Sequence, residues 1–498
     1  MVYPSYPPQP SEKEESFIND TIIDWSLGNG LAMLTPEGKG VTAVHAPVTV
    51  YPSPFPRSGF ESALNVQTTF NELYANVSDN TEWLTEALKD VTVLDHDFTG
   101  KLYESYVKAK EIGITQPLSL GIFRSDYIVN EDGSKTNEED SVSIKQVEFN
   151  TVSVSFGSLS SKVSQLHTYL ADSDTYGPSA EFLKGKTAIS KSIDGLADGL
   201  AVAYKEYAKN NVLVSGYSKQ VVLFIVQPGE RNVFDQRHIE YSLYNNYGIT
   251  SYRVTLDNVR LETKLLETNG VQKLIYTPTN AEVSVVYYRS GYAPTDYPTE
   301  EEWDARVYLE TSHAIKSPTL LTQLSGAKKI QQILTDKETI RKFLPNSTPQ
   351  NLEQLLATFV DLYPMDTSPN GLIARKLAQE QPEKFVLKPQ REGGGNNVYK
   401  ENIPGFLKTL PEEQWGAYIL MELIKPPEFK NKILRAGEIY FGGVISELGV
   451  FGTILWDSSN SKILHNEQVG WLLRSKLQSS NEGGVAAGFG CIDSVYLF

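Results

Sequence analysis

The residues best suited to chemistry stand in one glycine-rich segment, Lys388-Pro-Gln-Arg-Glu392-Gly-Gly-Gly-Asn-Asn-Val-Tyr399. Three adjacent glycines let backbone N–H groups approach an anion closely, because glycine adopts positive φ without steric cost. Lys388 adds a positive charge for a phosphate, and Glu392 can bind Mg²⁺, which prefers one or two carboxylates together with substrate phosphates. A hairpin loop with exposed charges is the alternative, but it does not explain why a cation, a carboxylate and glycines stand together. The segment therefore predicts a phosphate and magnesium site.

A second cluster lies near the C-terminus, where a predicted strand at 470–476 carries Arg474 and Lys476. Side chains two residues apart on a strand share a face, so both cations point the same way. The glycine-rich stretch 482–488 follows them and can accommodate an anion. An ordinary glycine-rich turn is the alternative for this cluster.

A third cluster lies on a predicted strand at 142–155, which alternates apolar and polar residues. Glu148 and Asn150 share one face of such a strand, as do Ser153 and Ser155. A carboxylate and an amide oxygen two residues apart are suitable ligands for a hard cation. The polar face of an exposed strand is the alternative.

Two polar sets follow predicted buried strands at 221–227 and 283–288. Since α/β folds bind ligands beyond the carboxyl ends of parallel strands, we expect these sets to line a site. Lys328 and Lys329 either begin a helix and reach a phosphate or are solvated. The two sets consist of Gln227, Glu230, Arg231, Asn232 and Gln236, and of Arg289, Ser290, Gly291 and Tyr292.

Several common catalytic motifs are absent from the sequence. Gly185-Lys186-Thr187 lacks the first glycine of a P-loop, whose place Ala180 takes, and no GxGxxG follows a strand. The six histidines are isolated, there is no GxSxG, and Cys491 has no nearby His. The remaining carboxylates, cations and glycine loops suit phosphoryl transfer, which depends on positioning and charge neutralisation.

The overall composition restricts the class of protein further. The chain has 498 residues, and its 45 basic and 61 acidic residues give a net charge of −16 without a basic run. We therefore expect no nucleic-acid partner. One cysteine cannot form an internal disulfide and fits a reducing compartment. Because there is no secretory signal and no apolar run of about 20 residues, we expect a soluble, cytoplasmic protein without a membrane partner.

Helices and short strands of an α/β fold must position these clusters. The strand–helix–strand alternation around 235–246 predicts parallel βα units, and the prolines of 48–56 predict extended chain. We place domain boundaries near 215 and 328, after a disordered leader at 1–15. We expect helices at 17–34, 59–90, 96–112, 235–246, 301–315 and 326–343. We expect strands at 118–127, 142–155, 221–227, 283–288, 384–389, 417–424, 441–456 and 470–476.

Long motifs occur in the same order as in a known family: IKQVEFNTVSVSF, RNVFDQ, VVYYRSGY, LLTQLSGAKKIQQ, KPQREGGGNN, and LLRSK followed by GGVAAGFG. From about residue 20 to the end, the chain resembles eukaryotic glutathione synthetase, and the fungal members most. The resemblance implies an ATP-grasp fold with a permuted element order, formed by 16–215 and 328–498. It also implies a parallel-sheet substrate-binding domain at 216–327, a mobile glycine-rich lid and a homodimer.

The implied reaction joins γ-glutamyl-cysteine to glycine, with Mg²⁺ as cofactor and ATP as co-substrate. The cysteinyl carboxylate would attack the γ-phosphate, and the glycine amine would then displace phosphate from the acyl phosphate. Two alternatives stay open: a ligase for β-alanine or another acceptor, and a nucleotide-binding regulatory protein without chemistry. The small side chains of Val485-Ala486-Ala487 favour glycine, and the intact carboxylates and cations argue against a loss of chemistry.

Matched residue by residue, the resemblance assigns roles across all the clusters. Arg474, Lys388 and Gly394 match catalytic positions, and Glu148, Asn150 and Glu392 match magnesium ligands. ATP contacts are matched by Glu148, Lys328, Lys388, Pro389, Gln390, Arg391, Gly393, Gly394, Gly395, Asn396, Asn397, Tyr399, Met421, Glu422, Leu423, Ile424, Glu447, Lys476 and Glu482. Dipeptide contacts are matched by Arg124, Val152, Ser153, Val154, Ser155, Glu230, Arg231, Asn232, Gln236, Arg289, Ser290, Gly291 and Tyr292, and the glycine end by Arg474, Val485 and Ala486. Glu482 stands where some relatives carry Asp, which keeps the acid but lengthens its reach.

Overall fold

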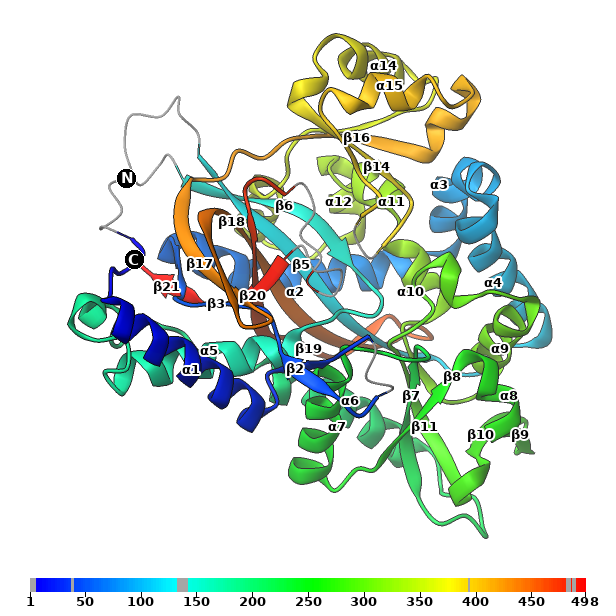
Figure 1. The fold of residues 1–498 in the computed structure, drawn as a ribbon. Helices are drawn as coiled ribbons and strands as arrows, with labels where there is room; N and C mark the ends of the chain where they lie inside the picture. The colour runs from blue at the N-terminus through cyan, green and yellow to red at the C-terminus, as the bar shows by residue number, and fades with distance from the viewer. Residues whose placement is uncertain (1–5, 37–39, 132–141, 393–394, 481–484, 486–489) are drawn as a thin grey trace.

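The computed structural model describes residues 6–36, 40–131, 142–392, 395–480, 485 and 490–498. Within these residues, thirteen strands form one large mixed sheet (Figure 1). Its main path runs through β17 (Phe429–Arg435), β3 (Val48–Thr49), β20 (Gly490–Asp493), β19 (Lys462–Leu477), β18 (Glu438–Asp457), β5 (Leu118–Glu131), β12 (Ile315–Ser317), β11 (Ala281–Tyr288), β10 (Val271–Tyr276) and β9 (Thr263–Thr268). Beside this path, β6 (Val142–Asn150) pairs with β5, and β7 (Gln220–Val226) pairs with β11 and with β8 (Ser251–Thr255).

The part of the sheet built from 216–327 contains the predicted parallel strands. β8, β7, β11 and β12 are parallel, and β12 pairs in parallel with β5. α7 (Val233–Tyr247) follows β7 as predicted. The parallel pairing predicted for this domain does not extend to its edge, where β9 and β10 form an antiparallel hairpin and β10 pairs antiparallel with β11. The hairpin turn is Asn269-Gly270, both with positive φ, a pair that favours two-residue hairpins.

Two hydrophobic cores lie on the two faces of this sheet, so every residue of β7 is buried. One core contains α2 (Arg57–Asp79), α3 (Thr81–Leu94), α4 (Lys101–Ile112), α9 (Glu300–Thr311), α10 (Leu320–Ser325), α11 (Lys328–Ile333), α12 (Lys337–Phe343) and α13 (Pro349–Ala357). The other contains α1 (Glu12–Asn29), α5 (Gly157–Asp172), α6 (Ser192–Asn210) and α7. The β-branched and aromatic run of β7 is the pattern expected for a strand covered on both faces.

A smaller four-stranded sheet stands apart at the top of Figure 1. Its order is β13 (Leu362–Pro364), β16 (Tyr418–Glu422), β14 (Phe385–Pro389) and β15 (Val398–Tyr399). With α14 (Pro369–Glu380) and α15 (Asn402–Leu407), it encloses a separate core that includes Met365, Leu387 and Trp415. This unit carries the glycine-rich segment that begins at Lys388.

The first helix differs from its prediction at both ends. α1 begins at Glu12 because Ser11 and Glu14 form a capping box, so residues 12–15 are not part of a disordered leader. It ends at Asn29 because Gly30 takes the left-handed conformation at φ 71°. The following residues then form β1 (Ala32–Leu34), which pairs with β2 (Ala43–His45).

Two other boundaries differ from the sequence-based expectations. The strand predicted at 142–155 ends at Asn150, and Ser153 has a φ of 55°, so Ser153 and Ser155 do not share a strand face. The helix predicted at 326–343 is divided into α11 and α12, because Asp336 caps the second helix through Thr339 N. The remaining short elements are β4 (Ser53–Phe55), which pairs with β21 (Val495–Leu497), and α8 (Val259–Glu262).

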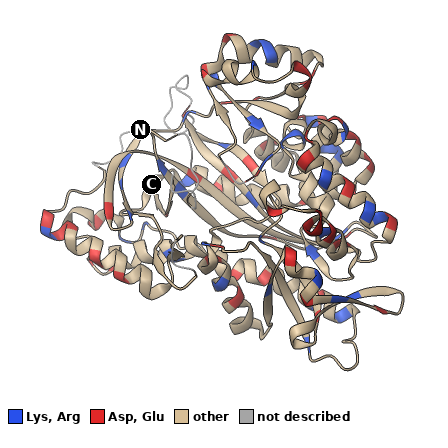
Figure 2. Ribbon diagram, turned by 45° about the vertical axis from the view of Figure 1, so that its right-hand side comes forward, with Lys and Arg blue, Asp and Glu red and all other residues tan. Residues whose placement is uncertain are grey.

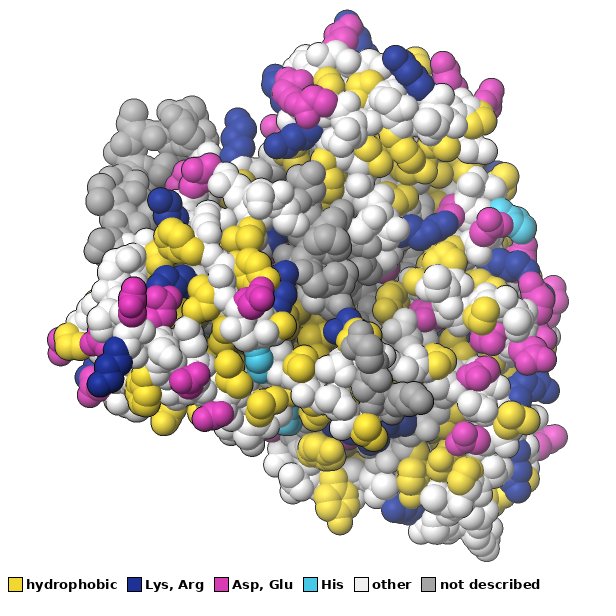
Figure 3. Space-filling model, viewed as in Figure 1, with side chains coloured by type: hydrophobic (Ala, Val, Ile, Leu, Met, Phe, Trp, Pro, Cys, Tyr) yellow, Lys and Arg dark blue, Asp and Glu magenta, His cyan; other side chains and the backbone are white. Residues whose placement is uncertain are grey.

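Charged residues are distributed over the whole molecule. Figure 2 shows acidic and basic positions interspersed on both sheets and their helices. On the face seen in Figure 3, the described acidic and basic side chains alternate with apolar ones. In the part of the chain that the structure describes, no helix has the length and apolar composition needed to span a membrane.

Candidate active site

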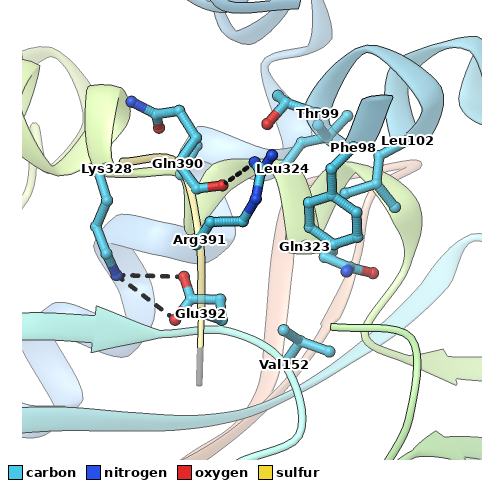
Figure 4. A pocket seen from close by; sticks show the side chains of 11 residues that line it. Phe98, Thr99, Leu102, Val152, Gln323, Leu324, Lys328, Gln390, Arg391 and Glu392 are labelled. Carbon is cyan, nitrogen blue, oxygen red and sulfur yellow. Dashed lines mark hydrogen bonds and ion pairs between the residues drawn. The ribbon is translucent and has the colours of Figure 1, made fainter. Parts of the chain in front are cut away.

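Lys328, the first residue of α11, is the centre of an ion cluster between the two sheets. Its Nζ lies 3.0 Å from Glu148 Oε2 on β6 and 3.3 Å from Glu392 Oε1, which follows β14. Figure 4 shows Lys328 and Glu392 pointing toward each other. The Lys328 residue is only 3% exposed, so the solvated alternative is wrong for it. Three distant chain segments thus bring two carboxylates to one ammonium group.

The charges in this cluster shift one another's pKa values. Burial alone would raise the pKa of Glu148, but Lys328 and Lys388 outweigh it and lower that pKa. Burial raises the pKa of Glu392, an effect that Lys328 opposes and Glu148 reinforces. Burial also lowers the pKa of Lys388 to about 8, and Lys388 Nζ donates to Val147 O at 2.8 Å. A further cation beside Glu392 would favour its charged form.

A second ion cluster lies on the neighbouring strands β5, β18 and β19. Asp126 pairs with Arg124 through both carboxylate oxygens, with N–O distances of 2.6 and 2.7 Å. Arg474 Nη2 lies 3.3 Å from Asp126 Oδ2 and also pairs with Glu447, which stands opposite it across the β18–β19 ladder. Asn150 Nδ2 donates to Asp126 Oδ2 at 3.0 Å. Arg474 is thereby held beside Asn150 and Arg124.

A third group lies at the carboxyl ends of β7 and β11, as predicted for the two polar sets. The Arg289 side chain is 1% exposed and its Nη2 donates to Ser155 Oγ at 2.8 Å and Asp235 Oδ2 at 3.1 Å. Its Nε and Nη1 have no hydrogen-bond partner among the described residues. Glu230 accepts hydrogen bonds from Asn232 N at 2.6 Å and Gln236 Nε2 at 3.0 Å. A buried guanidinium with two unused donors is suited to a carboxylate ligand.

The loop that follows Arg289 is held by Asp296, whose Oδ2 accepts from Gly291 N at 2.9 Å and Tyr292 N at 3.0 Å. Gly291 has a φ of 87°, which favours glycine at this turn. Tyr292 Oη accepts from Gln227 Nε2 at 3.1 Å. The loop therefore stands beside the first polar set. Ser290, which precedes Gly291, is buried.

A small cavity of about 30 Å³ adjoins Lys328 and Glu392 (Figure 4). Arg391 lines it but turns to Asp95, with Nη1 2.6 Å from Asp95 Oδ2 and the guanidinium 5.6 Å from the centre of the Phe98 ring. Gln390 bridges Lys329 N and Ala417 O, both at 3.1 Å. These two predicted ATP contacts therefore make protein contacts that hold the segment after β14.

The other predicted ATP contacts lie on or beside the small sheet, apart from Lys476 on the large sheet. Met421 is buried on β16, Glu422 is exposed at its end, and Leu423 N donates to Lys384 O at 2.8 Å. At the edge of the small sheet formed by β15, Asn397 Nδ2 donates to Tyr399 Oη at 3.3 Å. Pro389 ends β14, Ile424 is half-buried, and Lys476 is half-buried on β19 opposite Ile445.

The family was identified by comparison with known proteins. A family model described as "Eukaryotic glutathione synthase, ATP binding domain" matches residues 12–497. The chain belongs to this family. It is 39% identical over 492 residues to "Glutathione synthetase large chain" of Schizosaccharomyces pombe, covering 95% of this chain and 96% of that protein. It is 37% identical over 478 residues to the human "Glutathione synthetase", covering 95% of each chain.

A solved structure shares the fold. The apo form of a glutathione synthetase-like effector from Globodera pallida superposes with a TM-score of 0.74 at 23% sequence identity, covering 98% of each chain. At this identity the likeness concerns the fold alone. It agrees with the mixed α/β architecture described above.

Several family-matched positions lie elsewhere or outside the described residues. Arg231 Nε donates to Leu34 O at 3.1 Å, which directs it to β1. Val152 lines the small cavity, while Val154 and Val485 belong to the core that contains α5. Gly395 has a φ of 78°, and Asn396 Nδ2 lies 3.5 Å from Glu392 O. Four predicted site residues, and with them most of the predicted lid, lie outside the described residues: Gly393, Gly394, Glu482 and Ala486.

Sequence reasoning missed three buried or bridging acids: Asp126, Asp235 and Asp296. Asp126 could have been found, because it stands two residues after Arg124 on a predicted strand and so shares its face. Asp235 accepts from Phe156 N at 2.9 Å and Ser158 N at 2.8 Å at the start of α5. No spacing in the sequence connects Asp235 to that distant helix.

Cavity size alone does not mark this site. A larger cavity of about 660 Å³ lies between α2, α6 and β19. Among the residues that the structure describes, its lining includes Asp194, Asp198 and His465 but none of the predicted site residues. The chemistry of the side chains therefore places the candidate site at the junction of the two sheets.

The donor set fits a magnesium ion that arrives with phosphates. Among the described residues, no group of three or more His, Cys, Asp or Glu side chains is placed to hold a metal ion. Glu148 and Glu392 nevertheless approach the same point at Lys328 Nζ. Two carboxylates leave the other positions of an octahedral ion to phosphate and water oxygens.

Proposed function

We propose that this chain is an ATP-dependent ligase that joins γ-glutamyl-cysteine to glycine, giving glutathione, ADP and phosphate. The family match over 12–497 and the names of the relatives support this reaction. The observation that carries the proposal is the junction of two ion clusters, one around Lys328 and one around Asp126. They lie on neighbouring strands, since Asp126 and Glu148 are directly paired between β5 and β6.

In the first step, the cysteinyl carboxylate attacks the γ-phosphorus of ATP and ADP leaves, which forms an acyl phosphate. Negative charge on the transferred group must be neutralised as it passes between two oxygens. Lys328 and Lys388 stand beside Glu148 and supply positive charge there. Glu148, Asn150 and Glu392 would hold Mg²⁺, which supplies charge neutralisation on the phosphate oxygens when bound.

In the second step, the amine of glycine attacks the acyl carbon, phosphate leaves, and the amine loses a proton. Arg474 would pair with the carboxylate of glycine, because guanidinium groups bind carboxylates in a two-point geometry. Arg289 would bind a carboxylate of the dipeptide through Nε and Nη1, which have no hydrogen-bond partner among the described residues. These two arginines would fix the acceptor and the donor on either side of the reacting carbon.

The finer architecture belongs to the same proposal. In an ATP-grasp arrangement, the nucleotide would lie between the small sheet and the large sheet, with its phosphates toward Lys388 and Lys328. The catalytic role of Arg474, Lys388 and Gly394 and the homodimeric state follow from the family resemblance and stay predictions. The cytoplasmic location, expected from the sequence, stays a prediction as well.

The test is ADP release by the purified chain with ATP, Mg²⁺ and γ-glutamyl-cysteine, with and without glycine. We expect ADP and glutathione in equal amounts only when glycine is present. If β-alanine supports the same rate as glycine, the enzyme is not specific for glycine as acceptor. If ADP release does not depend on the dipeptide, the proposed ligase activity is refuted. Mass spectrometry of the product distinguishes the three outcomes.

A further inference from the structure

The carboxylate of Asp126 accepts four N–H groups from three residues. Arg124 Nε donates to Oδ1 at 2.6 Å, and Oδ2 accepts from Arg124 Nη2 at 2.7 Å, Asn150 Nδ2 at 3.0 Å and Arg474 Nη2 at 3.3 Å. Oδ2 thus accepts three of the four N–H groups and Oδ1 accepts one. The side chain is 0% exposed. Because it is fully buried among these donors, Asp126 does not bind a metal ion or a substrate directly.

The strand beside Asp126 leaves room for this arrangement. Gly449 on β18 is paired with Asp126 on β5. A Cβ atom at Gly449 would lie 2.8 Å from Arg124 Cδ and 2.8 Å from Asp126 Oδ1. Both distances are too short for real contacts, so any side chain at 449 would displace the arginine, the aspartate or both.

Asp126 connects two parts of the proposed site that no other described carboxylate joins. Arg124 Nη1 donates to Ser155 O at 3.2 Å, and Ser155 Oγ accepts from Arg289, which places Arg124 on the dipeptide side. Arg474 stands on the proposed glycine side. We propose that Asp126 is a positioning residue that fixes Arg124 and Arg474 relative to each other. Position 449 must be glycine for this, because a side chain there would collide with Arg124 and Asp126. The inference rests on the proposed function.

The first test is Asp126→Asn. The amide has one acceptor oxygen and turns an NH₂ group toward guanidinium donors, so both arginines lose their common anchor. A misplacement of about 1 Å at a reacting centre can cost about 100-fold in rate. We expect kcat/KM for γ-glutamyl-cysteine and for glycine each to fall about 100-fold, with weaker dipeptide binding by calorimetry. ADP affinity, measured without Mg²⁺ so that the Asn150 contact does not enter, should stay at the wild-type value.

The second test perturbs the same pair from another strand. Gly449→Ala should reproduce the loss in kcat/KM for both amino-acid substrates with unchanged ADP affinity. Gly452→Ala is the matched control on the same strand, because its Cβ would meet Asn71 Oδ1 on α2 and not the arginine–aspartate pair. It should lower the melting temperature without changing the ratio of dipeptide to ADP affinity. If Asp126→Asn does not fold, the comparison of these two alanine variants decides.

Wild-type kcat/KM values for both amino-acid substrates in folded Asp126→Asn would overturn the inference, as would equal losses of ADP and dipeptide binding. Identical effects of Gly449→Ala and Gly452→Ala would overturn it as well. If the wild-type chain binds γ-glutamyl-cysteine but makes no glutathione, only the proposed function fails, and the binding data still decide the role of Asp126. If it neither binds nor ligates the dipeptide, both fail.

Discussion

Two buried charged networks, one within the large sheet and one at its junction with the small sheet, differ in whether their charges are matched. Lys273 on β10 pairs with Glu282 on β11 at 2.9 Å, with side chains 5% and 0% exposed. Tyr207 Oη donates to Glu282 Oε1 at 2.8 Å and Val214 N donates to Oε2 at 3.0 Å. In this closed network one cation meets one anion, and the protein supplies every partner of the carboxylate.

The network at the candidate site is open by comparison. Glu148 and Glu392 share Lys328, and Arg289 keeps two buried donors without a partner among the described residues. Buried polar groups are usually satisfied, and those that are not need a reason. A matched buried network is therefore structural, whereas unmatched groups at the junction of two sheets indicate a ligand.

The largest effect should come from breaking the closed network on one side. Glu282→Gln leaves Lys273 buried without a counter-charge, so we expect the free energy of unfolding to fall by about 3–5 kcal/mol. kcat of the folded fraction should not change. Denaturant titration and steady-state kinetics measure the two quantities.

The double variant Lys273→Met with Glu282→Met is the control, because apolar side chains of similar size can replace a buried ion pair at little cost. Recovery of most of the lost stability is expected. A double variant as unstable as the single one would mean that the charges themselves are needed there.

A substitution in the open network should lower activity and leave stability unchanged. Glu392→Gln removes a carboxylate that lies 3.3 Å from Lys328, and we expect kcat to fall about 100–1000-fold with unchanged unfolding. Glu380→Gln is the control in the same small unit, because Glu380 is exposed and 3.8 Å from Lys376. If Glu392→Gln turns over near the wild-type rate at ordinary Mg²⁺ concentration, the assignment of Glu392 to the active site is refuted.

A second closed network offers a comparison through pH. His167 is fully buried, with Nδ1 2.7 Å from Ser494 Oγ and Nε2 2.9 Å from Thr49 O. Burial lowers its pKa from 6.5 to about 4. The unfolded chain therefore binds more protons between pH 6.5 and 4. The contribution of neutral His167 to the free energy of unfolding is complete above pH 6.5. As the pH falls toward 4, the free energy of unfolding decreases by about 3 kcal/mol through this group.

His167→Gln should show a flatter decline of unfolding free energy over this range, measured as the difference from wild type. The difference is needed because burial raises the pKa of nearby Asp493 to about 6, which gives the opposite slope. Identical slopes for wild type and variant would contradict the assignment.

The smallest effect should come from an exposed pair. Lys101 Nζ lies 2.8 Å from Glu300 Oε1, but the Glu300 side chain is 65% exposed. Glu300→Gln should lower the free energy of unfolding far less than Glu282→Gln does, and less still at high salt, because solvent and salt screen an exposed pair. A cost as large as that of Glu282→Gln would mean that burial does not separate the two kinds of pair.

Much of the site could be predicted from the sequence because its residues alternate within single elements. Glu148 and Asn150 on β6, and Arg474 and Lys476 on β19, follow from the two-residue period of a strand. Ser153 and Ser155 could not be predicted in this way, because the strand ends at Asn150 and Ser153 takes a positive φ. Local spacing predicts a shared face only while the element continues.

The sequence by itself determined the types of group available, the buried strands, the start of a helix at Lys328 and the family motifs. Only the tertiary structure decided which groups meet. Lys328 and Glu148 are far apart in sequence, but Lys328 Nζ lies 3.0 Å from Glu148 Oε2. The side chain of Arg391 points away from the glycine-rich segment and pairs with Asp95. Asp126 becomes the common partner of two arginines only when β5 is paired with β18 and β6. Such contacts depend on the order and register of strands, which follow from packing across the whole sheet and not from local spacing.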